Sequence, residues 1–237
     1  MTEPAVRVRW LVGTVHSVRS ETATARSIVL DVPGWPGHLA GQHVDLRLTA
    51  PDGYQAVRSY SLAAPADGQR VELTVQLIED GEVSPYLVDV VLPTEQVELR
   101  GPVGGWFSWD PDRPGPVLLV AGGSGIVPLM AMVRARAAAA STAPFTLVYS
   151  VRGPAQRYYA EELDRVDGLD LRMVHTREAG PNGRPPGRIG PADLDVALGA
   201  RVYVCGPTGF VDAAIALLLA AGHDAADIRS ERFGGQP

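Results

Sequence analysis

Short stretches in which apolar and polar residues alternate fill the first hundred positions of the chain. Alternation with a period of two is typical of strands that have one buried face. The clearest stretches are residues 12–18, 27–32, 43–48 and 71–77. Together with the glycine- and proline-containing turns between them, they predict a six-stranded antiparallel barrel. One short helix is predicted over residues 84–90, because Ser84 can cap its first turn and Pro85 suits the first helical position.

A different pattern follows residues 109–116, where prolines, glycine and aspartates interrupt the apolar positions as in a linker. Residues 117–121 form a continuous apolar strand, and a glycine turn leads from it into an apolar helix that extends to about Ala140. Further strands are predicted at residues 145–149, 169–174 and 202–205. Strands that alternate with helices predict a parallel sheet covered on both faces. The predicted fold class is therefore β + α/β, with a barrel domain at residues 1–112 and an α/β domain at residues 113–237.

Composition and charge narrow the possible partners. The net charge is −6, from 21 basic and 27 acidic residues, so no basic surface favours nucleic acid or an anionic membrane. The single cysteine, Cys205, is too few for a disulfide within the chain or for an iron–sulfur cluster. The histidines lack metal-ligand spacing, so no metal site is expected. Residues 1–10 lack a signal-peptide core and no apolar stretch is long enough to span a bilayer, which predicts a cytoplasmic protein.

The turn between the apolar strand and its helix has the sequence Gly123-x-Gly125-x-x-Pro128. Glycines let a backbone approach a pyrophosphate closely, and the start of a helix supplies amide donors and the positive end of its dipole. Pro128 lies in the first helical turn, where its missing N–H breaks no hydrogen bond. The turn is interpreted as a dinucleotide-binding site, although close packing alone also selects glycines between a strand and a helix.

A second motif, Arg58-Ser59-Tyr60-Ser61-Leu62, lies on a predicted barrel strand. It resembles the flavin-binding Arg-x-Tyr-Ser motif of the ferredoxin–NADP reductase superfamily. Other landmarks of that superfamily have similar counterparts here, in the same order, at residues 81–87, 101–107, 123–128, 204–207 and 231–233. The resemblance covers essentially the whole chain, and it implies a flavin-binding barrel followed by a nucleotide-binding domain.

The resemblance implies that the barrel holds FAD, with FMN as the alternative found in related members. The guanidinium of Arg58 suits the flavin phosphates, and Ser84 at a helix start suits a second phosphate contact. Tyr60 is assigned to the face of the isoalloxazine ring and Ser61 to a hydrogen bond near its N5 atom. The resemblance assigns further cofactor contacts to Ser59, Gln76, Leu77, Ile78, Gly81, Val83, Gly123, Ser124 and Gly125. For the motif taken alone, the alternative is an ordinary barrel strand in which Tyr60 packs and Arg58 and Ser61 are solvated.

The resemblance assigns catalysis to Ser61, Cys205 and Glu231. Cys205 ends a predicted parallel strand together with Gly206 and Pro207, where open α/β sheets bind their ligands. In the superfamily a cysteine here lies beside the nicotinamide C4 and the flavin N5, whereas a free cysteine is otherwise a small buried hydrophobe. Phe233 is assigned to the flavin face that the nicotinamide must reach, and Glu231 to polarising the site. Packing at a strand end is the alternative for Phe233.

The choice between NADPH and NADH depends on the groups around the adenosine 2′ position. Residues 149–154, after the second strand of the α/β domain, include Arg152 but no acid, and Arg177 follows the third strand. We hypothesise NADPH, with its 2′-phosphate held by Ser150, Arg152 and Arg177. The alternative is that these arginines form a solvated face, which leaves NADH as the donor.

The chemistry implied is hydride transfer from the nicotinamide C4 to the flavin N5, followed by release of electrons to an acceptor. Since the chain has one cysteine and no ligand set for an iron–sulfur cluster, we expect a separate acceptor, such as a ferredoxin or an oxygenase component. Two alternatives stay open: a reductase of free flavin or another small molecule, and a non-catalytic electron-transfer subunit of a larger assembly. Nothing in the sequence indicates an oligomeric state.

Overall fold

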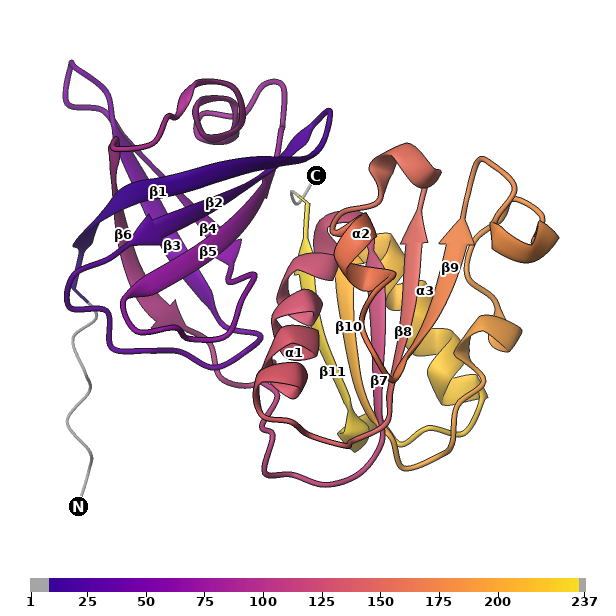
Figure 1. The fold of residues 1–237 in the computed structure, drawn as a ribbon. Coiled ribbons are helices and arrows are strands. Elements are labelled where there is room, and N and C mark those ends of the chain that lie inside the picture. The colour runs from indigo at the N-terminus through magenta and orange to yellow at the C-terminus, as the bar shows by residue number, and fades with distance from the viewer. Residues whose placement is uncertain (1–8, 235–237) are drawn as a thin grey trace.

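The computed structural model describes residues 9–234, which form two sheets that lie side by side (Figure 1). Most of the N-terminal stretch that lacks a signal-peptide core is outside the described residues. Among the helices of residues 9–234, none is both long enough and apolar enough to cross a membrane. The first sheet ends at Val103 and the second begins at Val117. The predicted boundary after residue 112 lies between them and stays a prediction.

Six antiparallel strands make up the first sheet, in the spatial order β4-β3-β6-β1-β2-β5. They are β1 (Leu11–Thr22), β2 (Ala25–Asp31), β3 (His43–Thr49), β4 (Gln55–Ser61), β5 (Arg70–Gln76) and β6 (Gln96–Val103). An antiparallel bridge between Leu62 and Leu73 brings the two edge strands, β4 and β5, together. Alternate residues such as Val44 and Leu46 of β3 pack into one apolar core inside the curved sheet. The predicted six-stranded antiparallel domain is confirmed.

A π-helical turn at Tyr86–Val90 packs on this core, in which its Leu87 is buried. The helix predicted over residues 84–90 is confirmed, because the backbone is already helical at Ser84. The predicted role of Ser84 as a helix cap is wrong, since no side chain caps the turn. The Ser84 hydroxyl instead accepts the backbone N–H of Ile78 at 3.0 Å, which ties down the loop that leads into the turn.

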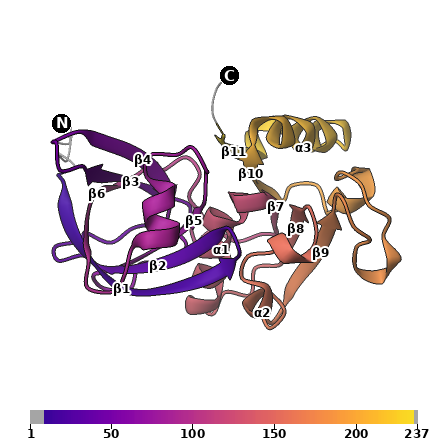
Figure 2. The ribbon, with the colours of Figure 1, turned by 90° about the horizontal axis from the view of Figure 1, so that it is seen from above.

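Five parallel strands form the second sheet, in the order β11-β10-β7-β8-β9. They are β7 (Val117–Gly122), β8 (Phe145–Val151), β9 (Leu169–His175), β10 (Arg201–Pro207) and β11 (Ile228–Phe233). Helix α3 (Thr208–Ala220) covers one face, and α1 (Ile126–Ala138) with the short α2 (Ala160–Leu163) lies on the other (Figure 2). Every residue of β7 is buried because its side chains alternate between these two layers. The predicted parallel sheet with helices on both faces is confirmed.

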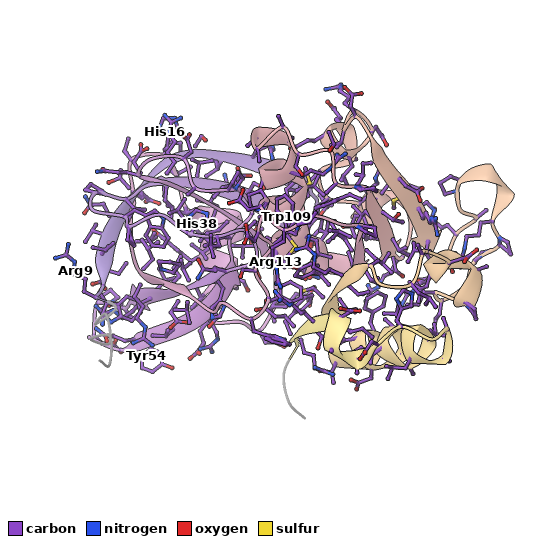
Figure 3. The ribbon with its side chains drawn as sticks, turned by 90° about the horizontal axis from the view of Figure 1, so that it is seen from below. Arg9, His16, His38, Tyr54, Trp109 and Arg113 are labelled. Atoms are coloured by element: carbon purple, nitrogen blue, oxygen red, sulfur yellow. The ribbon has the colours of Figure 1, made fainter. Side chains whose placement is uncertain are left out.

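Helix α1 lies between the parallel sheet and the barrel (Figure 1). Its residues from Ile126 to Val133 are all buried, which is the pattern of a helix covered on every side. The segment before β7 contributes Trp109, whose ring packs edge-on against Phe145 with 5.2 Å between centroids, and Figure 3 shows it where the two sheets meet. Ala25 and Ala63 of the barrel are buried in the same cluster. The two domains therefore share a continuous apolar contact.

Candidate flavin and nucleotide site

The glycine turn joins β7 to α1 at the carboxyl edge of the parallel sheet. Gly123, Ser124 and Gly125 form one 3-10 turn, and the helix starts at Ile126. A Cβ atom on Gly125 would lie 2.1 Å from the backbone carbonyl oxygen of Cys205, so β10 passes directly beside the turn. Gly123 has a φ of +55°, and no atom lies within 4 Å of the place its Cβ would take. The turn is therefore open to a ligand on one side and closely packed on the other.

A cleft of about 300 Å³ opens over this turn, and we call it the nucleotide cleft. Of the residues predicted from the sequence, it brings together Gln76, Gly123, Ser124, Ser150, Arg152, Pro207 and Phe233. Thr22 and Thr24, from the hairpin between β1 and β2, also line the cleft, which therefore lies between the two domains. Leu77 is not part of this lining, and its backbone N–H donates to the carbonyl of Thr24 at 2.8 Å.

The ends of β8 and β9 carry the predicted phosphate-binding residues. Ser150 and Arg152 line the nucleotide cleft, while Arg177 is outside its lining but donates its backbone N–H to the carbonyl of Arg152 at 3.0 Å. The sequence shows no acid directly after β8, yet the loop after β9 brings in the carboxylate of Glu178. A Cβ on Gly153 would lie 2.1 Å from that carboxylate. The strand ends therefore hold two cations and one anion beside the cleft.

A second cleft, of about 320 Å³, lies between β4 and the ends of β10 and β11, and we call it the junction cleft. Its lining consists of His43, Ser59, Ser61, Cys205, Glu231, Arg232 and Phe233. The three residues predicted to be catalytic therefore meet there, although Ser61 belongs to the barrel and Cys205 and Glu231 belong to the parallel sheet. Phe233 lines both clefts, so the two spaces adjoin at its side chain. Gly206 follows Cys205 on β10 and is buried.

Burial changes the protonation of two groups in the junction cleft. Cys205 and Glu231 are paired in the register of β10 and β11. Burial raises the pKa of Glu231 to about 7. Burial, together with the charge of Glu231, raises the pKa of the Cys205 thiol well above its ordinary value. Cys205 is thus a neutral thiol rather than a thiolate, and Glu231 exchanges its proton near neutral pH.

The stability of the protein is expected to depend on the ionisation of Glu231. The pKa of Glu231 is raised in the folded state. The stability that its protonated form contributes is therefore fully present below about pH 4.5 and is lost as the pH rises through about 7. The unfolding free energy of Glu231→Gln minus that of the parent should therefore increase by about 1–2 kcal/mol from about pH 4 to about pH 8. This value is discounted for the partial exposure of Glu231. Urea denaturation at both pH values measures the difference. A pH-independent difference between the two proteins would contradict the assignment.

The Arg-x-Tyr-Ser motif occupies β4, an edge strand of the barrel. The Arg58 guanidinium pairs with the carboxylate of Glu82, so the first and second predicted flavin motifs contact each other. Tyr60 packs against the barrel core, and burial raises its pKa to about 12, which keeps the phenol neutral. Ser59 donates its hydroxyl to Asp45 at 2.6 Å. The strand therefore presents an accessible cation beside a neutral aromatic ring.

The loop between β5 and the π-helical turn is held by the Ser84 hydroxyl and by a hydrogen bond of 2.9 Å from the N–H of Gly81 to the carbonyl of Ile78. A Cβ on Gly81 would lie 2.9 Å from both the Ser84 hydroxyl and that carbonyl oxygen, so a larger residue would displace the loop. Val83 is buried in the barrel core, and its carbonyl accepts the backbone N–H of Leu87 at 3.2 Å, so its cofactor contact stays a prediction. The phosphate contact assigned to Ser84 stays a prediction.

His43 and Phe210 are among the cleft residues that the sequence-based assignment misses. His43 lines the junction cleft, where burial lowers its pKa. Phe210 lines the nucleotide cleft, and its ring lies where a Cβ on Gly122 or on Gly206 would be, at 2.6 and 2.7 Å. Glycines at the ends of two neighbouring strands leave room for a large side chain, so Gly122 and Gly206 are a sequence signal for the ring of Phe210. A histidine in an alternating strand carries no such signal.

The groups around the two clefts fit a flavin and a nicotinamide dinucleotide. The backbone at Gly123 faces open space that a side chain would occupy. Arg58 and Arg152 supply guanidinium groups of the kind that bind phosphate, and Ser61 supplies a hydroxyl between the domains. Residues 9–234 contain no group of His, Cys, Asp and Glu side chains that is arranged to hold a metal ion.

Comparison with known protein families agrees with this geometry. Residues 15–108 match the oxidoreductase FAD-binding domain, and residues 119–215 match the oxidoreductase NAD-binding domain. The chain belongs to the ferredoxin–NADP reductase superfamily, in which it combines the two domains of an NAD(P)H-dependent flavoprotein reductase.

Several relatives are named as components or subunits of monooxygenases and dioxygenases. The ferredoxin–NAD(P)+ reductase component of the naphthalene 1,2-dioxygenase system of Pseudomonas putida is 30% identical over 220 residues, which are 90% of this chain and 65% of that protein. Methane monooxygenase component C of Methylosinus trichosporium is 31% identical over 175 residues, 72% of this chain and 48% of that protein. The chain thus spans about half to two thirds of the length of these relatives.

A solved structure is similar over nearly its whole length. The FAD/NAD-binding domain of nitric oxide dioxygenase from Vibrio cholerae has a TM-score of 0.84 with this chain at 25% identity, covering 95% of this chain and 99% of that one. An Amycolatopsis cytochrome P450 reductase is 28% identical with a TM-score of 0.81, covering 95% of this chain and 70% of that one. The arrangement of the two domains described above is therefore shared with these proteins.

Proposed function

We propose that the chain oxidises NADPH, passes the electrons to a bound FAD and delivers them to a separate acceptor protein. The observation that carries this proposal is the junction cleft. It joins Ser61 of the flavin motif to Cys205 and Glu231 at the edge of the nucleotide-binding domain, and it adjoins the nucleotide cleft at Phe233. When bound, the flavin supplies the capacity to accept a hydride and to release single electrons.

The residues of the chain orient the reactants and manage protons. The Ser61 hydroxyl is available to the flavin ring from the barrel side of the cleft. The neutral thiol of Cys205 adds no charge where a hydride would pass, and Glu231 holds a proton that it releases near pH 7. Phe233 lies between the two clefts, so a nicotinamide reaches the flavin only where this side chain gives way.

Replacement of Arg152 by alanine tests the preference for NADPH. A guanidinium paired with the 2′-phosphate predicts that the KM for NADPH rises about tenfold or more, while the KM for NADH changes by less than about twofold. Steady-state assays with each nucleotide measure both values.

Glu178→Gln is the matched variant for Arg152→Ala, because it removes the anion beside the same cleft. We expect it to lower the KM for NADPH, since it removes a repulsion from the phosphate. Equal changes for both nucleotides in Arg152→Ala, or a higher KM for NADPH in Glu178→Gln, would assign these residues to a solvated face.

The separate acceptor is supported by the relatives. The glycine betaine monooxygenase reductase subunit of Pseudomonas aeruginosa, 30% identical over 210 residues, is named as a reductase subunit. The test compares turnover with a plant-type ferredoxin, a bacterial [2Fe–2S] ferredoxin and free FMN. A higher kcat/KM for a ferredoxin supports the proposal, and faster turnover with free FMN alone would place the chain among small-molecule reductases.

A further inference from the structure

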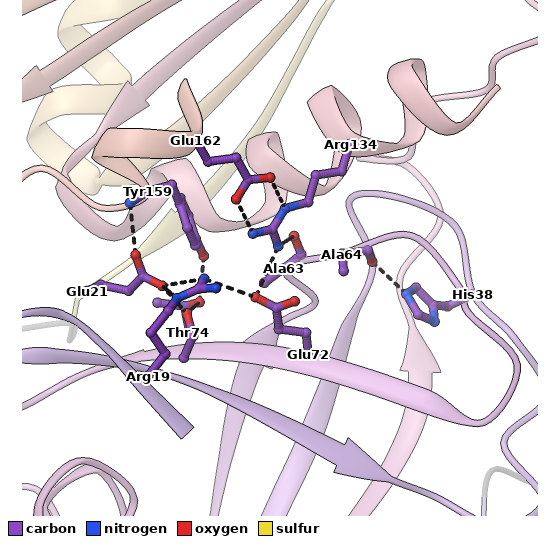
Figure 4. A network of polar contacts seen from close by, with 11 residues as sticks. Arg19, Glu21, His38, Ala63, Ala64, Glu72, Thr74, Arg134, Tyr159 and Glu162 are labelled. Atoms are coloured by element: carbon purple, nitrogen blue, oxygen red, sulfur yellow. Dashed lines mark hydrogen bonds and ion pairs between the residues drawn. The ribbon is translucent and has the colours of Figure 1, made fainter. Parts of the chain in front are cut away.

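A network of charged and hydroxyl side chains connects the barrel to the nucleotide-binding domain on the side of α1 (Figure 4). We call it the interdomain network, and it consists of Glu21, Glu72, Thr74, Arg134, Tyr159 and Glu162. The first three residues belong to strands β1 and β5, and the last three belong to α1 and the start of α2. The residues assigned to the flavin and the nucleotide do not include any of these six.

Arg134 makes contacts in both domains at once. Its side chain is 15% exposed and forms two hydrogen bonds, of 2.8 and 2.6 Å, with the carboxylate of Glu162. Toward the barrel it donates to the carbonyl of Ala63 at 2.9 Å and to the carboxylate of Glu72 at 3.1 Å. Ala63 follows Ser61 of the flavin motif by two residues. Arg134 therefore connects the end of the flavin-motif strand to the helix that begins at the glycine turn.

Tyr159 adds a second connection, at a cost in backbone strain. Its φ of 54° and ψ of 31° are left-handed, a conformation that a bulky aromatic residue rarely adopts. Both of its hydrogen-bond donors are bound by the barrel: the backbone N–H donates to Glu21 at 2.9 Å, and the hydroxyl donates to Thr74 at 2.5 Å. Such a conformation persists only where surrounding contacts fix it. The barrel therefore determines the backbone at the start of α2.

The charges of the network favour one orientation of the domains over all others. Arg134 and Glu72 are largely removed from water, so a rotation that separates Arg134 from Ala63 and Glu72 would leave these groups without their partners. Buried ion pairs add little net stability compared with apolar packing, but a wrong arrangement of them is strongly disfavoured. The shared apolar contact through α1 tolerates small shifts, whereas these directional hydrogen bonds do not.

We propose that Arg134 is a positioning residue that fixes the orientation of the nucleotide-binding domain on the barrel, and so the distance between the two sides of the junction cleft. The part of this proposal that concerns hydride transfer rests on the proposed function. Hydride transfer is sensitive to the placement of the reactants, and a displacement of about 1 Å can lower a rate by about a hundredfold.

The test replaces Arg134 by methionine, which keeps the length of the side chain and removes its charge and donors. Arg136→Met is the matched control on the same helix, because Arg136 bonds the carbonyls of Ala143 and Asp167 and lies over the ring of Phe145, all within the nucleotide-binding domain. Small-angle scattering measures the domain arrangement. We expect Arg134→Met, and not Arg136→Met, to increase the radius of gyration.

A second readout reports on the junction cleft itself. In FAD-loaded protein, the long-wavelength absorbance of a stacked flavin–nicotinamide pair is measured at saturating nucleotide. We expect Arg134→Met to lose most of this absorbance and to lower kcat by about tenfold or more, with KM within about twofold of the parent. The control should keep both. Tyr159→Phe removes only the hydrogen bond to Thr74, and it should show smaller changes in the same direction. It provides a second test of the proposal in case Arg134→Met does not fold.

Parental scattering and parental absorbance in both Arg134→Met and Tyr159→Phe would overturn the proposal, as would equal changes in Arg136→Met. If the parent protein itself shows neither absorbance nor turnover, the proposed function fails. Scattering then still decides whether Arg134 fixes the domains.

Discussion

Replacement of Gly125 by alanine is expected to disrupt the glycine turn and to prevent nucleotide binding. The new Cβ atom would lie 2.1 Å from the carbonyl oxygen of Cys205 and 2.4 Å from its carbonyl carbon, and both atoms belong to a central strand that cannot move aside. Overpacking in a packed interior costs about 1–3 kcal/mol of unfolding free energy, and this contact with immobile backbone places the cost at the upper end. Urea denaturation measures this loss, and the increase in the Kd for NADPH measures the loss of the turn.

Gly209→Ala is the control for this substitution. Gly209 lies in the first turn of α3, and no atom lies within 4 Å of its missing Cβ. Alanine there should leave nucleotide binding unchanged and raise stability by up to about 1 kcal/mol, because glycine is a poor helix former. A Gly125→Ala protein as stable as Gly209→Ala, with an unchanged Kd, would show that β10 does not pass against the turn as described.

Replacement of Arg58 by alanine is expected to release the flavin. The guanidinium lies on an accessible edge strand and contacts the loop of the second flavin motif through Glu82. The variant loses the charge-assisted contact between Arg58 and a flavin phosphate. This loss corresponds to an increase of about a hundredfold in the Kd for FAD. Equilibrium dialysis of FAD, or the flavin content of the purified protein, measures this. The barrel core should be unaffected, because Arg58 takes no part in it.

Glu82→Gln separates binding from structure. If Arg58 serves only to pair with Glu82, both variants remove the same ion pair and should weaken FAD binding equally. If Arg58 binds the flavin phosphates, Glu82→Gln should retain or strengthen FAD binding, because it frees the guanidinium and removes a nearby negative charge. Equal losses of flavin in the two variants would therefore contradict the role of Arg58.

The two sheets could be predicted from the sequence because their patterns are local. Strand β3 alternates buried and half-buried residues, and β7 is buried throughout. The apolar pattern of a few consecutive residues therefore indicates whether one or both faces of each strand are buried. The glycine turn was visible for the same reason. The helix cap predicted for Ser84 is wrong because the choice between capping a helix and bonding Ile78 depends on the path of the preceding loop.

The charges around the site depend on contacts that are distant in sequence. Glu178 follows Arg152 by a whole strand, yet its carboxylate lies against Gly153, so the region after β8 is less basic than its own residues indicate. Arg134 and Arg136 are two residues apart on one helix and look alike in the sequence. Only the packing of α1 between the sheets shows that Arg134 contacts the barrel and Arg136 does not.

Anaerobic titration of the FAD-loaded protein with NADPH, followed by addition of oxidised ferredoxin, tests the central claim most directly. The account predicts that about one equivalent of NADPH bleaches the visible band of the flavin, that NADH does so less well, and that ferredoxin restores the band. A protein that does not bind FAD, or one whose bound flavin keeps its band in excess NADPH and NADH, would contradict it.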